Sequence, residues 1–327
     1  MVTRRRLVIA LGAGAFAAPL ASFAQEPAKI ARIGFLGAGS ASVTASWVEA
    51  LRTGLRDLGY IEGKNIVIEY RWADGKYERL ADLAGELVRL KVDVLVTHGT
   101  SGTRAAKQAT TTIPIVMAIS GDAVGTGLVA SLARPGGNIT GSTAISPELM
   151  GKLIELLKET FPRMKRVAVL LNPNNAVSAP ILKTMEIAAR SLKLELQRFE
   201  VRSTDKIESA FSAMVNKKAE AVVIHQDPML VDNIKTIADL ASKERLPSIG
   251  FIEFCEAGGL MAYSVNRVEM FRRAGYFVDR ILKGTRPADL PVEQPTKFEL
   301  VINLKTAKTL GIKFPNSIMV QATKVIE

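Results

Sequence analysis

The chain has 327 residues, of which 48% are apolar, and its length and composition suit two domains with hydrophobic cores. Its net charge is +11, but lysines and arginines are scattered without a run of five and only 6% of residues are aromatic, which argues against nucleic acid binding. A single cysteine, Cys255, excludes an intramolecular disulfide, and one cysteine with two histidines argues against a zinc site.

Residues 1–24 show the pattern of a secretory signal. Arg4, Arg5 and Arg6 precede residues 7–20, which carry no charge, and small residues near Ala24 offer a cleavage site. Fourteen uncharged residues fall short of the roughly 20 that span a bilayer. We therefore expect cleavage near Ala24 by the Sec or the twin-arginine route and a periplasmic chain, whose charge falls from +11 to +8 when the three arginines are lost.

From residue 30 to 143, short apolar runs alternate with amphipathic helical patterns, which is typical of βα units around a parallel sheet. The predicted strands are 30–36, 66–71, 92–96, 113–119 and 139–143. Trp47, Leu51 and Leu55 belong to a helical stripe that we expect to end at Gly59. Further helices are predicted at 77–90, after His98, and up to about residue 133.

A second series of the same kind follows and predicts a second parallel sheet. Its helix begins at Pro147, after Ser146 as N-cap. The predicted strands are 167–171, 194–201, 221–225 and 247–251. The last predicted elements are a strand at 260–264, a helix at 270–282, a strand at 297–303 and a helix at 304–310. Two halves with extra terminal elements indicate that the chain crosses between two lobes more than once.

Candidate binding residues lie where the predicted strands end, because open α/β sheets bind ligands beyond the carboxyl ends of their strands. The turns there are small and polar. Hydroxyls and backbone N–H groups at helix N-termini favour a carboxylate, and Asp122, Asp227 or Glu253 could hold an ammonium. Phe251 is a candidate pocket-lining residue. Helix capping explains any single turn equally well, but repetition in both halves favours a binding site for an amino-acid-like zwitterion.

Three enzymatic or nucleotide-binding patterns are incomplete. Gly37-Ala38-Gly39 begins a dinucleotide motif, but its third glycine would fall at Ser42, and no P-loop sequence is present. Gly99-Thr100-Ser101-Gly102-Thr103 misses the last glycine of a GxSxG nucleophile elbow. Neither histidine has a convincing triad order. We therefore expect no cofactor, no metal and no catalysis.

Several segments along the whole mature chain resemble the family of ABC transporter substrate-binding proteins that includes tryptophan- and tyrosine-binding members. The matching segments are IGFLG at 33–37, GYIEGKN at 59–65, EYRWA at 69–73, ARPGGN at 133–138, LNPN at 171–174 and QPTKFELVIN at 294–303. Each segment is weak alone, but their joint occurrence in this order is specific.

The resemblance implies a type I periplasmic-binding-protein fold, in which two Rossmann-like lobes with parallel sheets are joined by a three-stranded hinge and hold the ligand between them. We expect an N-terminal lobe of residues 25–143 plus 262–295 and a C-terminal lobe of 144–261 plus 296–327. The resemblance also implies ABC permease and ATPase subunits as partners of a monomeric chain, and an aromatic amino acid as a family-level ligand. The residues it places at the ligand are Ser40, His98, Gly99, Thr100, Ser120, Gly121, Asp122, Ser146, Asp227 and Glu253.

Two other functional classes share this scaffold. An effector-sensing transcription regulator would carry a helix-turn-helix segment where this chain has the export signal. An enzyme on a Rossmann-like scaffold would need Ser101 or a comparable nucleophile to act, which the incomplete motifs do not favour.

Overall fold

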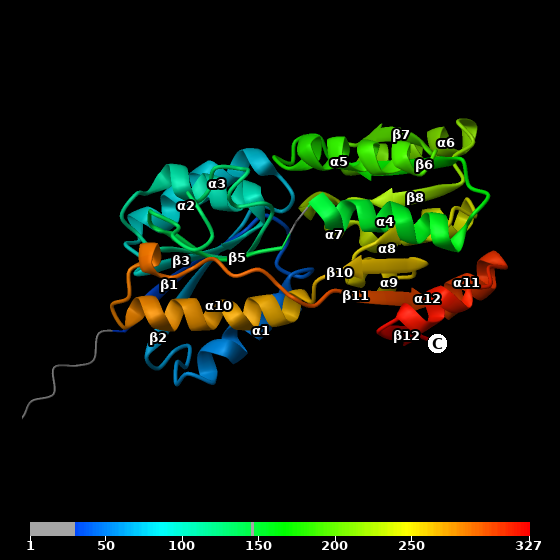
Figure 1. Ribbon diagram of the computed structural model, residues 1–327. Coiled ribbons are helices and arrows are strands. Elements are labelled where there is room, and N and C mark those ends of the chain that lie inside the picture. The colour runs from blue at the N-terminus through cyan, green and yellow to red at the C-terminus, as the bar shows by residue number, and fades with distance from the viewer. Residues whose placement is uncertain (1–29, 145–146) are drawn as a thin grey trace, which may run out of the picture.

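The computed structural model describes residues 30–144 and 147–327. The expected secretory signal, residues 1–24, and Ser146 lie outside these ranges. The described chain forms two lobes, each built on a mainly parallel sheet covered by helices (Figure 1). The predicted α/β class with two parallel sheets is therefore confirmed.

The N-terminal lobe has a five-stranded parallel sheet in the order β2-β1-β3-β4-β5. Its strands are β1 (Ala31–Gly37), β2 (Ile66–Trp72), β3 (Val94–His98), β4 (Ile115–Ser120) and β5 (Ile139–Thr143). The helices between them are α1 (Ala45–Arg56), the short 3₁₀ helix η1 (Tyr77–Arg79), α2 (Leu80–Arg89) and α3 (Gly99–Ala109). Figure 1 shows α2 and α3 on one face of this sheet.

The other face of the sheet is covered by α1 together with α10 (Arg267–Leu282), which comes from much later in the chain. The two helices meet through glycines: a Cβ on Gly54 would lie 2.1 Å from the Arg272 carbonyl oxygen, and one on Gly275 would lie 2.8 Å from the Gly54 carbonyl carbon. The apolar stripe of α1, with Trp47, Leu51 and Leu55, is buried against the sheet as its periodicity predicted.

The C-terminal lobe has a seven-stranded sheet in the order β12-β11-β10-β9-β8-β6-β7, in which only the β10–β11 pair is antiparallel. Its strands are β6 (Arg166–Leu171), β7 (Glu195–Glu200), β8 (Ala221–Ile224), β9 (Ser248–Gly250), β10 (Met261–Ser264), β11 (Glu299–Asn303) and β12 (Lys324–Ile326). Its helices are α4 (Pro147–Thr160), α5 (Ser178–Ser191), the short 3₁₀ helix η2 (Thr204–Lys206), α6 (Ile207–Asn216), α7 (Pro228–Asp232), α8 (Ile234–Lys243), α9 (Ile252–Glu256), α11 (Leu304–Leu310) and α12 (Asn316–Gln321).

Side chains of β6 alternate between two buried clusters. Val167 and Val169 pack in the cluster that contains α4 and α5, whereas Ala168 and Leu170 pack in the cluster that contains α6 and α8. The second cluster continues into the N-terminal lobe, so one buried apolar core runs across the junction of the lobes.

The chain passes between the lobes three times: after β5, between β10 and α10, and before β11 (Figure 1). The first and third passages lie side by side, because the Thr143 amide donates to the Glu293 carbonyl at 2.9 Å. At the second, the Asn266 side chain donates to Glu299 at 3.1 Å. Strand β10 belongs to the seven-stranded sheet and α10 packs on the five-stranded one, and the lobe boundaries themselves stay predictions.

One predicted element is wrong. The region between β4 and β5 forms turns and bends rather than a helix up to residue 133. Gly127 there has a φ of +71°, which interrupts helical geometry, and Pro135 precedes two glycines. The sequence patterns also did not indicate the short elements α7, α9, α12 and β12, whose lengths are too small to show a period.

Candidate ligand-binding site

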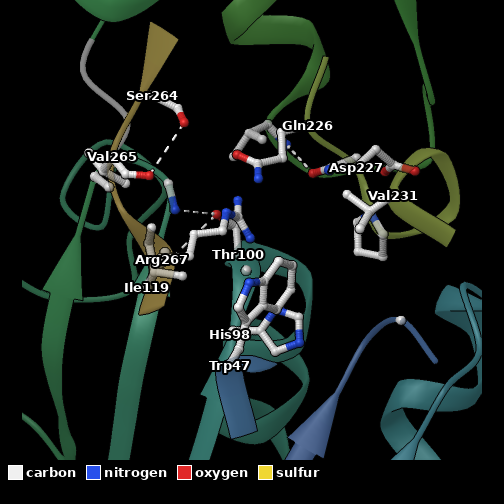
Figure 2. A pocket seen from close by; sticks show the side chains of 18 of the residues that line it. Trp47, His98, Thr100, Ile119, Gln226, Asp227, Val231, Ser264, Val265 and Arg267 are labelled. Carbon is white, nitrogen blue, oxygen red and sulfur yellow. Dashed lines mark hydrogen bonds between the residues drawn. The ribbon is translucent and has the colours of Figure 1, made fainter. Parts of the chain in front are cut away.

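A cavity of about 80 Å³ lies between the lobes, at the carboxyl ends of strands from both sheets (Figure 2). The N-terminal lobe contributes the start of α1 and the turns after β1, β3 and β4, and the C-terminal lobe contributes the turns after β6 and β8. Residues of two crossing segments complete its wall, with Ala144 and Leu149 from the first and Ser264, Val265 and Arg267 from the second.

The start of α3 forms part of the N-terminal wall. Gly99, with a φ of +71°, turns the chain from β3 directly into the helix. The Thr100 hydroxyl oxygen accepts a hydrogen bond from the Gly121 amide at 3.2 Å and lies 3.3 Å from the Ser120 hydroxyl. The first-turn amides of the helix, with its dipole, favour a negative group at this end of the cavity.

Arg267 is the cation of the cavity. Its guanidinium carbon lies 4.9 Å from the centre of the Trp47 ring, and Figure 2 shows the side chain reaching into the middle of the pocket. Burial lowers the pKa of Arg267, and nearby Glu253 partly offsets this. Within residues 30–144 and 147–327, the guanidinium has no ion-pair or hydrogen-bond partner. An anionic ligand group would therefore meet a guanidinium whose hydrogen-bond donors have no partner among the described residues.

Asp232, half-buried at the end of α7, is a carboxylate that can still accept hydrogen bonds from a ligand. Its Oδ1 accepts hydrogen bonds from the backbone N–H and the hydroxyl of Ser40, at 3.2 and 3.0 Å. Burial raises the pKa of Asp232, the Ser40 bonds oppose this, and Asp74 and Asp227 add to the rise. Its Oδ2 has no hydrogen-bond donor among the described residues, so it can accept from a ligand ammonium.

Asp227, by contrast, is fully engaged by the protein. Its Oδ1 accepts from the Asn172 side chain at 3.2 Å and from the backbone amides that begin α7, and its Oδ2 accepts from Asn175 at 3.1 Å and from the Tyr77 hydroxyl at 2.5 Å. Burial raises the pKa of Asp227, and these donors oppose the rise. The residue therefore acts as a helix cap and a link between the lobes, with little capacity left for a ligand.

Among the residues that the structure describes, three hydrogen-bonded contacts cross the cleft from one lobe to the other, and we call them the closure bonds. They join Ser40 to Asp232, the Tyr77 hydroxyl to Asp227, and the Trp47 indole N–H to Glu253 at 3.1 Å. Donors come from the N-terminal lobe and carboxylates from the C-terminal lobe in every case. Together with the shared buried core, the closure bonds hold the two lobes against each other across the cleft.

His98 forms an aromatic wall of the cavity together with Trp47, the two ring centres being 5.8 Å apart. Burial lowers the pKa of His98 to about 3, and the nearby charge of Arg267 adds to this. The imidazole is therefore neutral at ordinary pH, and it offers a flat apolar face rather than a second cation.

The residues predicted from sequence fall into three groups. Those that line the cavity are His98, Gly99, Thr100, Ser120, Gly121 and Asp227, and Ser40 binds Asp232 at its edge. Asp122 lies elsewhere, with its carboxylate accepting from the Gly125 amide at 2.8 Å, and Phe251 and Glu253 do not line this cavity. Ser146 is outside the described residues.

Sequence reasoning missed Arg267 and Asp232. Arg267 is the first residue of α10 and carries no local motif, and Asp232 ends a helix of five residues. Trp47 was interpreted as a core residue; it is only 2% exposed, yet one edge of it faces the cavity. A helical stripe shows that a residue is buried, but it cannot show whether the neighbouring space is filled.

Two negative findings apply to the part of the chain that the structure describes. No group of three or more histidine, cysteine or acidic side chains there could hold a metal ion. Across the same residues, no helix is both long and apolar enough to cross a membrane.

Comparison with known proteins shows to which family the chain belongs. Residues 40–326 match the family described as "ABC transporter substrate binding protein". The chain belongs to this family. A "Tyrosine-binding protein" of Clostridioides difficile is 27% identical over 260 residues, which cover 79% of this chain and 74% of that protein.

Two solved structures share the whole two-lobed architecture. A conserved domain protein from Vibrio cholerae is 28% identical, with a TM-score of 0.85 over 91% of this chain and 100% of that chain. An ABC domain in complex with L-Trp from Streptococcus pneumonia is 27% identical, with a TM-score of 0.82 over 90% and 100%. The chain is thus a solute-binding protein rather than an enzyme, and members of its family are typically extracellular or periplasmic.

Proposed function

We propose that this chain captures an amino acid in the cleft between its lobes and delivers it to an ABC importer. The observation that carries the proposal is the unpaired guanidinium of Arg267 in a cavity that also holds the half-free carboxylate of Asp232. An α-amino acid carries the two complementary charges on one carbon. Its carboxylate would bind Arg267 and the start of α3, and its ammonium would bind Asp232.

The remaining cavity wall supports an aromatic or other apolar side chain. Trp47, His98 and Ile119 offer carbon surface, and a neutral imidazole does not repel an aromatic ring. The relatives agree with this choice, since one is named a tyrosine-binding protein and another was solved with L-Trp.

Ligand capture is coupled to closure in this proposal. A ligand shifts the equilibrium between open and closed lobes only by its differential affinity for the two states. Arg267 and Asp232 meet the ligand together only when the closure bonds bring the lobes into contact, so a ligand held by both residues stabilises the closed form. The closed form is then what the permease and ATPase subunits of the importer recognise.

The cellular setting follows from the N-terminal sequence. Export of the chain with removal of residues 1–24 would place a free receptor in the periplasm, and a single copy contains the whole cleft described above. N-terminal sequencing of the protein isolated from the periplasm should find Gln25 first; an intact Met1 in the cytoplasm would contradict export.

The binding proposal is tested by thermal unfolding of the mature chain with L-amino acids and with matched compounds that lack one charged group. A ligand that binds only the folded state at 100 times its Kd adds about 2.7 kcal/mol of apparent stability. We expect at least one amino acid to stabilise the protein strongly, and its decarboxylated amine and its deaminated acid to do so weakly. Equal stabilisation by the amine would show that no carboxylate site exists, and no stabilisation by any amino acid would refute the proposed ligand class.

A further inference from the structure

A second cavity, of about 30 Å³, opens from the cleft into the C-terminal lobe. It lies on the face of the seven-stranded sheet that α4 and α5 cover, beyond the ends of β8 and β9. Leu149, Gln226 and Ser264 line both this cavity and the cleft, so the two spaces adjoin. Most of the remaining wall is apolar and includes Met150 and Met185.

Three buried polar atoms without partners belong to residues that line this cavity. His225 directly follows β8, and the alternation of side chains along the strand places it on the same side as Val223, facing α4. Its side chain lines the cavity, the residue is 4% exposed, and neither ring nitrogen has a hydrogen-bond partner among the described residues. The same is true of the Nε2 of Gln226.

The charge state of His225 narrows what this cavity can take. Burial lowers the pKa of His225 to about 4, so at neutral pH the ring is uncharged and offers one N–H donor and one acceptor. A hydroxyl group both donates and accepts, and it therefore matches a neutral imidazole better than a charged group does. A charged group would also lose its hydration on entering this mostly apolar cavity, which is unfavourable in free energy.

The position of these atoms points to a ligand rather than to the fold. Unpaired buried polar groups are destabilising, and Val223 next to His225 shows that an apolar residue fits on this face of the strand. Gln226 lines both the cleft and the second cavity, and His225 lines the second cavity, so their unpaired atoms lie on the side of the lobe into which the cleft opens. The two methionines beside them can adjust their shape to the entering group.

We propose that this second cavity is the side-chain subsite of the binding protein, and that it selects an apolar side chain ending in a hydroxyl by hydrogen bonds to His225 and Gln226. The inference rests on the proposed function, because Arg267 and Asp232 must hold the α-carbon at the mouth of the subsite. It assigns His225 as a specificity-determining residue that contributes nothing to recognition of the α-groups.

L-tyrosine and L-phenylalanine test the subsite, since they differ by one hydroxyl. Calorimetric titration of the mature chain should show L-tyrosine binding at least about tenfold more tightly, because L-phenylalanine leaves the polar atoms unpaired. In His225→Leu the preference should fall to within about twofold through weaker binding of L-tyrosine alone. His225→Gln restores one donor and one acceptor and should recover part of the preference.

The outcomes separate the two proposals. If both amino acids bind the wild-type protein equally well, or if His225→Leu keeps the preference for L-tyrosine, the subsite is refuted while the amino-acid cleft stands. If neither binds while another amino acid does, the subsite is refuted and the amino-acid cleft stands; if no amino acid binds, both proposals fail. Thermal unfolding of ligand-free His225→Leu should begin no lower than that of the wild type, because the variant removes two unpaired polar atoms. The ratio of the wild-type affinities for L-tyrosine and L-phenylalanine tests the subsite even where a variant folds poorly.

Discussion

At the scale of single residues, the proposed recognition of an amino acid depends on Arg267. Replacing it with methionine keeps the length and much of the contact with Trp47 but removes the charge and the hydrogen-bond donors. We expect the affinity for L-tyrosine to fall about 10- to 100-fold, the usual effect of losing hydrogen bonds to a charged group. The affinity for tyramine, which lacks the carboxylate, should stay nearly constant, and calorimetry measures both.

The matched control is Arg272→Met on the same helix. Arg272 pairs with Asp57 at 2.6 Å on the surface, away from the cavity, so its loss removes the same charge without touching the ligand. If the two variants weaken L-tyrosine equally, Arg267 acts only through the net charge of the protein and the carboxylate site is refuted.

We expect Asp232 to give ligand binding a pH dependence. Its ionised form is the one that accepts from an ammonium, and burial raises its pKa above the ordinary 3.8. The affinity should therefore be full above the raised pKa and be lost as the pH falls through it, at a higher pH than an ordinary aspartate would give. His98 and His225, with pKa values of about 3 and 4, stay neutral between pH 5 and 8 and add no step there.

Titrations of L-tyrosine between pH 8 and pH 5, where His225 stays neutral, measure this decline. Asp232→Asn should bind more weakly at neutral pH and should lose the acid-side decline. Asp227 also has a raised pKa, so a decline that persists unchanged in Asp232→Asn would assign the effect to Asp227 and contradict an ammonium at Asp232.

At the scale of elements, the contact between α1 and α10 sets the cleft wall, because α1 carries Trp47 and α10 begins with Arg267. Gly54→Ala should destabilise the protein by about 1–3 kcal/mol, since the new Cβ would lie 2.1 Å from a backbone oxygen and the helices must move apart. Denaturant unfolding followed by circular dichroism measures the effect.

Gly85→Ala in α2 provides the comparison. Its Cβ would approach only the flexible end of Arg89, at 3.4 Å, so the better helix propensity of alanine should raise stability by up to about 1 kcal/mol. A similar gain in stability in Gly54→Ala would mean that the contact between α1 and α10 can accommodate a methyl group.

Most elements could be predicted because their signals are local. The stripe of α1 and the β-branched runs of β3 and β8 show their period within a few residues. The rule that ligands bind at strand ends selected Thr100 and Ser120, which line the cavity. Arg267 and Asp232 gave no such signal. Ser40 and Asp232 are 192 residues apart in sequence, and only the docking of the lobes makes them neighbours.

At the scale of the whole molecule, the closure bonds link the two lobes across the cleft, and Tyr77→Phe removes one of them. Asp227 keeps its other donors, so the helix cap survives while the link across the cleft is lost. We expect the open form to gain population, with a larger radius of gyration in solution scattering and an affinity for L-tyrosine lower by about tenfold.

Tyr70→Phe is the control for this variant. Its hydroxyl accepts from Arg52 within the N-terminal lobe and makes no contact across the cleft. Scattering and affinity should match the wild type; a loss of affinity equal to that of Tyr77→Phe would indicate a general loss of stability and not a weakened closure.

The Trp47 closure bond also makes the protein its own optical sensor. The chain has two tryptophans, and Trp72 stacks on Tyr70 away from the cavity, with ring planes 5° apart. Under the proposed closure mechanism, Trp47 would instead lose the carboxylate of Glu253 from its indole N–H when the lobes part, so its surroundings would change. Occupancy of the cleft can thus be followed through one native indole against a constant internal reference, without attaching a dye.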